Sequence, residues 1–356
     1  MTSLLSYFRS YFDPTRPARL ANHSTGLIAR HLHELLSSWG PVEYCDHFER
    51  PQGMTGDLLV SHFWSFARVR AANRFRVGAA VYVLSDPVRA RDELETVAHR
   101  RGVPMPDWDL PPPDFDHDAT MEAADVVLLV GNRYTLETFP TRWQHKIRLV
   151  NYSVDPLLWA RPIVGERRPE FVYAATTCGL RKGFLDVLDV WSAIPPDEAT
   201  LHIVGRLEPP YDRLLAEANT GSIVAHGWID SDRDEYLALL RSCRFAYVPT
   251  WVEGQMGTLL EAVHAGCVPV TTEASGLDDR VLAHGVVIEP RDLSGQRTAI
   301  DEVLSWSDAE YHRRQTAVVA AAERHHSWDV FTRQVSEALG PVLEAEAQTQ
   351  GVLRHG

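Results

Sequence analysis

Two glutamates at a fixed spacing, Glu253 and Glu261, stand in the stretch YVPTWVEGQMGTLLEAVHAGCVPVTT, residues 247–272. The apolar residues before Pro249 predict a strand, Glu253 falls in the loop after it, and Glu261 falls about one turn into the helix that follows. In an open α/β sheet such a loop lies in the crevice at the carboxyl ends of the strands, where ligands bind. The first helical amides, at residues 257–260, suit a phosphate, and Glu261 can then reach a neighbouring sugar hydroxyl. The stretch predicts a nucleotide site.

Short apolar segments alternate with helical or loop segments along most of the chain, as βαβ units require. In the first half we expect a helix over residues 24–40, capped by Ser24 or Thr25, and strands at 57–64, 79–86, 124–131 and 146–155. In the second half we expect strands at 171–177, 201–205, 222–228, 243–250, 267–272 and 285–290. The economical architecture is two successive open parallel sheets that face each other, joined near residues 156–170.

The composition is that of a globular protein with two domains: 356 residues, of which 45% are apolar and 23% charged. Four scattered cysteines without a CxxC spacing indicate reduced thiols and a cytoplasmic location. The net charge of −13 argues against nonspecific binding to nucleic acid. We find no signal-peptide pattern and no apolar run near the ~20 residues that cross a bilayer.

Two segments of the first half leave a choice open. The first twenty residues gather Leu4, Leu5, Tyr7 and further aromatic residues before two prolines. This pattern fits a degenerate first strand, a packing arm or an interfacial segment. Four arginines at positions 68, 70, 74 and 76 are interleaved with aromatic residues. A solvated helix face is the favoured interpretation, and a docking patch for an anionic acceptor or a membrane surface is the alternative.

Residues 253–270, EGQMGTLLEAVHAGCVPV, resemble the signature of retaining glycosyltransferases of the GT-B fold, family 4, in which two glutamates are separated by seven residues. LRKG (180–183), GVVIEPRD (285–292), NYSVD (151–155) and HHSWDVF (325–331) resemble further segments of that family. The resemblance covers about residues 22–340 and is strongest over 171–290. It implies an acceptor-side Rossmann-like domain over 1–160, a nucleotide-sugar-binding domain over 161–328, and a helix over 329–356 that packs back on the first domain.

The resemblance also implies roles for single residues. Glu261 would hold the ribose hydroxyls, Lys182 would neutralise the departing diphosphate, and Glu253 would bind the donor sugar. The phosphates would meet the amides of Thr258, Leu259 and Leu260. The remaining expected site residues are Gly254, Gln255, Met256 and Gly257 in the sugar loop, Thr177 and Arg181 near the diphosphate, and Gly26 and His62 in the first domain, with His62 favoured over His23. The expected donor is a UDP-, GDP- or other ribonucleoside-diphosphate sugar, the acceptor a glycan, a lipid-linked sugar or a small molecule, and neither a cofactor nor a metal is expected.

The sequence departs from the family pattern at three places. The usual arginine five or six residues before the lysine is replaced by Thr176 and Thr177. Either Arg181 substitutes for it, or the diphosphate is held with one cation fewer. Gln255-Met256-Gly257 replaces Phe-Gly-Leu, and Met256 is expected to narrow the approach of the backbone to the sugar. Of the paired glycines in the first-domain loop only Gly26 remains.

Other interpretations stay beside this one. The sequence DFDHD (114–118) could indicate the metal-binding Asp-x-Asp of the GT-A fold, but it follows three prolines and a solvated acidic run is favoured. A binding or scaffold protein that has lost turnover is an alternative, because the usual arginine is missing and the sugar loop is altered. A hydrolysing sugar-nucleotide epimerase on the same fold is a further one.

Overall fold

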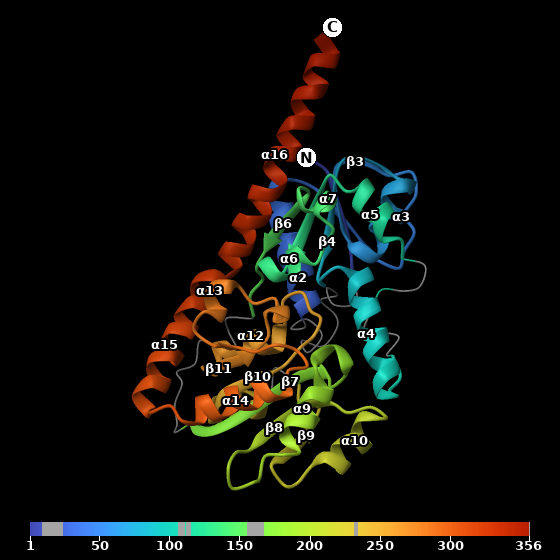
Figure 1. Ribbon diagram of the computed structural model, residues 1–356. Helices are drawn as coiled ribbons and strands as arrows, with labels where there is room; N and C mark the ends of the chain where they lie inside the picture. Colours follow the sequence, from blue (N-terminus) through green and yellow to red (C-terminus); the bar gives the residue numbers. More distant parts are fainter. Residues whose placement is uncertain (9–23, 106–110, 112–114, 155–166, 231–233, 356) are drawn as a thin grey trace.

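The computed structural model describes residues 1–8, 24–105, 111, 115–154, 167–230 and 234–355. They form two six-stranded sheets, which Figure 1 shows one above the other. The strand order is β2-β1-β3-β4-β5-β6 in the first sheet and β12-β11-β10-β7-β8-β9 in the second. The strand pairs of both sheets are parallel. The predicted α/β architecture of two parallel sheets is confirmed.

The first sheet carries its helices on both faces, so that its central strands are buried on both sides. Strand β5, VVLLV, is buried at every position, which explains its unbroken apolar sequence. The elements are β1 (Ser3–Tyr7), α2 (Ser24–Trp39), β2 (Val42–Asp46), β3 (Thr55–His62), α3 (Phe63–Ala72), β4 (Arg74–Tyr82), α4 (Pro87–Arg101), α5 (His117–Ala123), β5 (Val126–Val130), α6 (Arg133–Glu137), α7 (Thr141–Gln144) and β6 (Ile147–Val150).

The N-terminal residues form a strand inside the first sheet. Strand β1 pairs with β2 on one side and β3 on the other. Leu4, Leu5 and Tyr7 are fully buried there. Of the three predictions for the N-terminus, the strand is therefore correct for residues 3–7, and residues 9–23, with His23, lie outside the described part.

The arginines at 68, 70, 74 and 76 are largely engaged with their own domain. Arg70 pairs with Asp125 (3.2 Å) and Arg76 with Asp57 (3.0 Å). Arg68 donates to the carbonyl of His47 (2.8 Å). The predicted single helix face is wrong, because Arg68 and Arg70 lie on α3 whereas Arg74 and Arg76 lie on β4. The intradomain contacts speak against the alternative of a docking patch. In the described part of the chain, no helix combines the length and the apolar character that crossing a membrane requires.

Within the described part of the DFDHD segment, Asp116 and Asp118 make separate contacts. Asp116 caps α5 by accepting from the amide of Ala119 (2.9 Å). Asp118 pairs with Arg142 (3.0 Å), and Asp114 lies outside the described residues. The expectation that this run is not a diphosphate–metal motif agrees with these separate contacts.

The second sheet repeats the α/β alternation. Its elements are β7 (Arg168–Thr177), the 3₁₀ turn η2 (Leu180–Lys182), α9 (Phe184–Trp191), β8 (Leu201–Arg206), α10 (Tyr211–Ala218), β9 (Ile223–Gly227), α11 (Asp234–Ser242), β10 (Cys243–Val248), α12 (Gly257–His264), β11 (Val268–Thr271), η3 (Glu273–Ser275), α13 (Asp279–Leu282), β12 (Val286–Val287), α14 (Leu293–Leu304) and α15 (Asp308–His325). The strand predicted over 285–290 shrinks to the two residues of β12 at the sheet edge.

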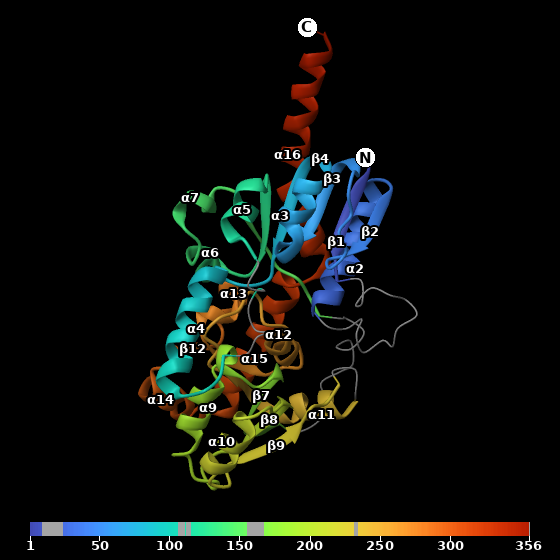
Figure 2. The same cartoon turned by 90° about the vertical axis from the view of Figure 1, so that its right-hand side faces the viewer.

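The C-terminal helix α16 (Trp328–His355) crosses from the second domain to the first. Phe331, Val335 and Leu339 are buried in a core cluster with residues of the first sheet. The ring of Trp328 stacks on His31 of α2, with centroids 3.5 Å apart. The far end of α16 projects beyond the first domain (Figures 1 and 2). The predicted boundary at residues 160 and 161 lies in the segment 155–166, outside the described part.

Further contacts hold the two domains together. Arg101 of α4 forms a bidentate ion pair with Asp189 of α9 (2.6 and 3.0 Å). Asn132 donates from its amide nitrogen to the carbonyls of Glu273 and Leu277, each at 2.9 Å. Such contacts fix the width of the space between the sheets.

Candidate functional site

A cavity of about 400 Å³ lies between the two domains, at the carboxyl ends of their strands. Nine of the predicted site residues line it: His62, Thr177, Arg181, Lys182, Glu253, Gln255, Gly257, Thr258 and Glu261. Five do not: Gly26, Gly254, Met256, Leu259 and Leu260. The cavity therefore gathers residues that the sequence separates by almost 200 positions.

One carboxylate and two cations meet on the second-domain side of the cavity. The Nζ of Lys182 forms an ion pair with Oε1 of Glu253. The Nη1 of Arg181 lies 3.3 Å from the same oxygen. The side chain of Glu253 is only 6% exposed, so the two cations compensate a carboxylate that is nearly out of water. Arg181 is thus placed beside Lys182, although the sequence offers no arginine at the family's usual position.

The turn that carries both cations is locked to the loop that carries Glu253. The carbonyl of Arg181 accepts from the hydroxyl of Thr250 and the amide of Trp251, each at 2.9 Å. Gly183 closes the turn at φ +69, and a Cβ there would lie 1.8 Å from the carbonyl oxygen of Pro249. Only glycine combines this left-handed conformation with so close an approach.

The Glu253 loop also rests on the first domain. The amide of Ser85 donates to the carbonyl of Glu253 (3.0 Å). A Cβ on Gly254 would lie 2.5 Å from the carbonyl oxygen of Val83 and 2.6 Å from that of Val130. Gly254 lies in the predicted sugar loop but does not line the cavity. It permits the contact between the domains, a role in backbone packing that a single sequence does not display.

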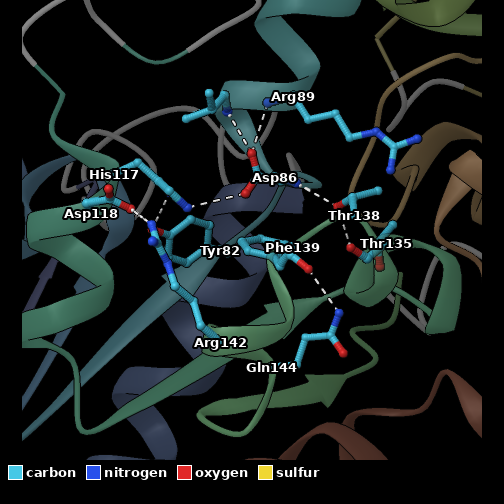
Figure 3. Close-up of polar contacts among 11 residues, drawn as sticks. Tyr82, Asp86, Arg89, His117, Asp118, Thr135, Thr138, Phe139, Arg142 and Gln144 are labelled. Atoms are coloured by element: carbon cyan, nitrogen blue, oxygen red, sulfur yellow. Dashed lines mark hydrogen bonds and ion pairs between the residues drawn. The ribbon is translucent and has the colours of Figure 1, made fainter.

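The Ser85 loop is itself held by a buried network, shown in Figure 3. Asp86 caps α4, its Oδ1 accepting from the amides of Val88 and Arg89 (2.9 Å each). Its Oδ2 lies 3.3 Å from Nε2 of His117, whose Nδ1 lies 3.2 Å from the hydroxyl of Tyr82. Sequence reasoning missed this network, because its members come from separate elements and form no local motif.

Glu261 is the second carboxylate that lines the cavity. Its Oε2 accepts a hydrogen bond from the hydroxyl of Tyr236 on α11 (2.7 Å). Burial raises the pKa of Glu261 to about 7, and the hydrogen bond from Tyr236 offsets part of that effect. Tyr236 also lines the cavity and is absent from the predicted site residues. No local motif in α11 indicates its polar role.

The first turn of α12 faces the same space, but not all of its predicted amides are available. The amide of Leu260 donates to the carbonyl of Met256 (3.1 Å), so its predicted part in phosphate binding is wrong. The amides of Gly257, Thr258 and Leu259 precede this first intrahelical bond. The N-cap residue Met256 makes no side-chain capping bond. The candidate phosphate amides are therefore shifted one residue toward the N-terminus.

Met256 does not narrow the sugar space as expected. Its side chain is buried in the core of the second domain, and its amide donates to the carbonyl of Ser275 (2.8 Å). Gln255, in contrast, lines the cavity, and its Nε2 donates to the carbonyl of Tyr152 (2.9 Å). The Oε1 of Gln255 has no hydrogen-bond partner among the described residues.

The first domain contributes an apolar and aromatic wall. His62 is buried at the N-terminus of α3, where its Nδ1 accepts from the amide of Trp64 (3.4 Å). Burial, and then the neighbouring His47, lowers the pKa of His62, so the ring is neutral near pH 7 and carries its proton on Nε2. The ring of Phe8 lies 4.8 Å from that of His62. Gly26 is buried within α2, and its neighbours Ser24 and Thr25 line the cavity instead.

Replacing Gly257 with alanine should weaken nucleotide binding and lower the melting temperature. A Cβ on Gly257 would lie 2.5 Å from the hydroxyl of Tyr152, whose side chain is 1% exposed and therefore has little room to move. Overpacking of this kind destabilises by about 1–3 kcal/mol. Thermal melting and calorimetric titration with nucleoside diphosphates check both effects. Gly340→Ala on α16, where a Cβ meets no atom within 4 Å, is the matched control. It should leave the affinity unchanged and should keep or slightly raise the melting temperature, because alanine is favoured over glycine by about 0.5–1 kcal/mol inside a helix.

The chain was compared with known families and structures. Residues 168–305 match the family model described as Glycosyl transferases group 1. The fold is similar to that of sucrose-phosphate synthase from Thermosynechococcus elongatus, with a TM-score of 0.68 and 16% identity over 97% of this chain and 99% of that one. It is also similar to an α,α-trehalose 6-phosphate synthase from Burkholderia multivorans, with a TM-score of 0.59 and 16% identity over 83% and 72%. A protein of Anabaena solved in complex with UDP and glucose gives 0.58 and 14% over 95% and 99%. A comparison with curated proteins gave no match.

These comparisons bear out the resemblance drawn from the motifs. The match to the group 1 model over residues 168–305 contains Lys182, Glu253 and Glu261. The structural similarity extends over both domains and confirms the GT-B fold. In the sequence, the motifs that predict this fold are fewer in the first half than in the second.

Proposed function

We propose that this protein, a GT-B glycosyltransferase with a second domain of group 1, moves a sugar from a ribonucleoside diphosphate to an acceptor hydroxyl with retention of configuration. The observation that carries the proposal is the arrangement of Lys182, Arg181, Glu253 and Glu261 around one interdomain cavity. Cations and helix amides suit a diphosphate, and the two carboxylates suit sugar hydroxyls.

The nucleoside end of the donor is assigned to Glu261 and its surroundings. An ionised carboxylate accepts hydrogen bonds from two ribose hydroxyls, and the Tyr236 hydroxyl orients it. Trp228 lines the same cavity and remains 42% exposed, with its indole nitrogen donating to Asp230 (2.9 Å). We assign the face of this ring to the base. The Anabaena protein solved with UDP and glucose makes uridine the first base to test.

The diphosphate is assigned to the space between the start of α12 and the two cations. The amides of Gly257, Thr258 and Leu259 precede the first intrahelical bond and lie at the positive end of the helix dipole. Lys182 neutralises the charge that grows on the departing diphosphate, and Arg181 takes the place of the family's usual arginine. Donors that are fixed before the reaction lower its barrier because they need no reorganisation.

The transferred sugar is assigned to Glu253 and Gln255. Glu253 is held by two cations and binds sugar hydroxyls as an acceptor. The unpaired Oε1 of Gln255 is a second acceptor beside the cavity. The acceptor hydroxyl approaches from the face that the diphosphate leaves, which yields retention. Glu253 is given no nucleophilic role, and the aromatic wall with His62 is assigned to the acceptor.

The proposal is tested in two steps. First, thermal shift with UDP, GDP, ADP and deoxy-TDP, with and without EDTA, should show stabilisation by a ribonucleotide that EDTA does not remove. Second, the matching sugar nucleotides should be hydrolysed slowly in the absence of an acceptor, and Glu253→Ala should abolish this turnover. Binding without turnover would favour the scaffold interpretation, and no response to any nucleotide would contradict the donor site. A strict metal requirement would contradict the proposed mechanism.

Replacing Trp228 with alanine should weaken binding of the nucleoside diphosphate by about five- to a hundredfold, because stacking on a base contributes ~1–3 kcal/mol. The melting temperature without ligand should fall only slightly, since Trp228 is 42% exposed and its ring contacts the Arg206 guanidinium at the surface (4.8 Å to the ring centroid). Calorimetric titration measures the affinity. Trp228→Phe, which keeps an aromatic face, should retain most of it, and equal loss in both variants would mean that the ring does not stack on the base.

A further inference from the structure

Three side chains of types that can ligate a metal gather in the second sheet, away from the cavity. They are Glu170 on β7, His202 on β8 and Cys243 on β10. One ligand atom of each lies within 4.8 Å of the other two, and this is the one such group of three found among the described residues. His202 and Cys243 are buried, and Glu170 is half-buried. The proposed sugar transfer uses none of the three.

The sheet itself brings these residues together. His202 is in register with Val172 of β7, so Glu170, two residues earlier, projects from the same face. Cys243 begins β10, the neighbour of β7 on its other side, and a shift in register follows it. All three lie near the amino ends of their strands, whereas Thr177 at the carboxyl end of β7 lines the cavity. The cluster and the cavity are at opposite ends of one strand.

A second histidine, His226, contacts His202. The Nε2 of His202 lies 2.8 Å from Oε2 of Glu170, and its Nδ1 lies 2.9 Å from Nε2 of His226 on β9. In metal sites a ligating histidine usually donates its other ring N–H to a neighbour, which fixes the ring. His226 is exposed and Glu170 is 18% exposed, so an ion has a path from solvent.

We propose that Cys243, His202 and Glu170 bind a zinc-type divalent ion that ties strands β7, β8 and β10 together. Thiolate, imidazole and carboxylate form a ligand set that Zn²⁺ accepts in tetrahedral geometry, with water in the fourth position. A thiolate excludes the hard ions Mg²⁺ and Ca²⁺ as the preferred occupants. Binding releases the thiol proton of Cys243 to solvent. The remaining ring proton of His202 moves to Nδ1 and is donated to His226.

One cation competes for the site. The Nη2 of Arg168 lies 3.1 Å from Oε2 of Glu170, and its side chain is 57% exposed. A metal ion must displace this arginine, which has room to swing into solvent. Removing it should therefore tighten metal binding, in the opposite direction to the loss of a ligand.

The test is a titration of the full chain, freed of metal with a chelator, with Zn²⁺ and with Co²⁺ as a spectroscopic probe. One equivalent of Zn²⁺ should bind, and a hundredfold excess over Kd should raise the melting temperature by roughly 5 °C. Bound Co²⁺ should give the ligand-field bands of a tetrahedral site and a charge-transfer band from a thiolate. Cys243→Ser and His202→Gln should each weaken binding at least about tenfold.

Two control variants make the test specific. Cys267→Ser removes a buried thiol outside the ligand group and should bind Zn²⁺ like the wild type. Arg168→Met should bind two- to fivefold more tightly, in line with the loss of an exposed ion pair. If Cys243→Ser does not fold, two other results test the proposal. Zn²⁺ binding should be weaker in Glu170→Gln, and the Co²⁺ spectrum of the wild type should show the thiolate band. No zinc binding at ~100 µM metal, about an order of magnitude above a ~10 µM Kd, would overturn the proposal. The absence of a thiolate band, or an equal loss of binding in Cys267→Ser, would also overturn it.

Discussion

Replacing Lys182 with alanine should lower kcat for sugar transfer by about 10²- to 10³-fold, the range seen when one preorganised charge-stabilising donor is removed. The lysine side chain is 14% exposed and reaches the oxygen of Glu253 inside the cavity. Charge grows on the diphosphate as its bond to the sugar breaks, and a fixed ammonium group compensates it in a space with little water. Steady-state transfer or hydrolysis of the sugar nucleotide measures the effect.

The fold of the Lys182→Ala variant should survive, because Arg181 still pairs with the Glu253 carboxylate (3.3 Å) and leaves no buried charge unpaired. Lys182→Arg should recover part of the activity, since the charge is kept but its position changes. Arg133→Ala, which removes an ion pair with Glu137 on an exposed helix face, is the matched control and should keep full activity. A Lys182→Ala variant with kcat within about threefold of the wild type (about 0.7 kcal/mol) would contradict the role given to this residue.

Binding of a nucleoside diphosphate should become weaker as the pH falls from 8 to 5.5, and Glu261 should be responsible. The pKa of this carboxyl is about 7 in the folded protein. Ribose hydroxyls donate to the ionised form, so the nucleotide must bind against a proton below that pH. The contribution of Glu261 to the loss of affinity at pH 5.5 should be about tenfold or more.

For the protein without ligand, the same pKa predicts that the contribution of Glu261 to folding stability decreases as the pH rises, opposite to the trend in nucleotide affinity. The folded pKa of about 7 lies above the value near 4.5 of an unfolded glutamate. Between these values the folded chain holds a proton that the unfolded chain has lost, so this group's contribution to stability falls as the pH rises from about 4.5 to 7. Glu261→Gln should therefore raise the melting temperature more at pH 8 than at pH 5.5.

The Glu261→Gln variant also distinguishes the contribution of the protein to the pH dependence of Kd from the contribution of the nucleotide. The terminal phosphate of the nucleotide titrates near pH 6, so part of any pH dependence belongs to the nucleotide. That part should remain in the variant, and the part that belongs to Glu261 should vanish. Identical pH dependence of Kd in both proteins would show that the carboxylate does not bind the ribose.

The second half of the chain could be predicted closely because its information is local. Each buried strand of the second sheet is an apolar run bounded by turn residues, and the motif around Glu253 and Glu261 fixes a strand, a loop and a helix in one stretch. Leu260 shows the limit of such local reasoning. Leu260 lies on the predicted helix. Which backbone amides of that helix are free of intrahelical hydrogen bonds, however, depends on the residue at which the helix begins.

The first half was less predictable because its site contacts are long-range. Gly254 packs against two backbone carbonyl groups of the first domain. Tyr152 lies against Gly257, although more than a hundred residues separate them in the sequence. The segment that forms β1 allowed three interpretations. A five-residue segment is too short to show the hydrophobic periodicity that would distinguish a strand from a packing arm. Asp86, His117 and Tyr82 come from three separate parts of the chain, so the sequence near one of them does not predict its contact with the others.

The most direct test of the donor site is a calorimetric cycle with UDP and 2′-deoxy-UDP on the wild type and on Glu261→Ala. A hydrogen bond to an ionised carboxylate contributes about 1.5–3 kcal/mol, so the wild type should prefer UDP by roughly ten- to a hundredfold. In the variant this preference should disappear, because the group that reads the 2′-hydroxyl is gone. A ribose preference of the same size in both proteins, or no binding of UDP to the wild type when GDP and ADP also fail to bind, would contradict the account.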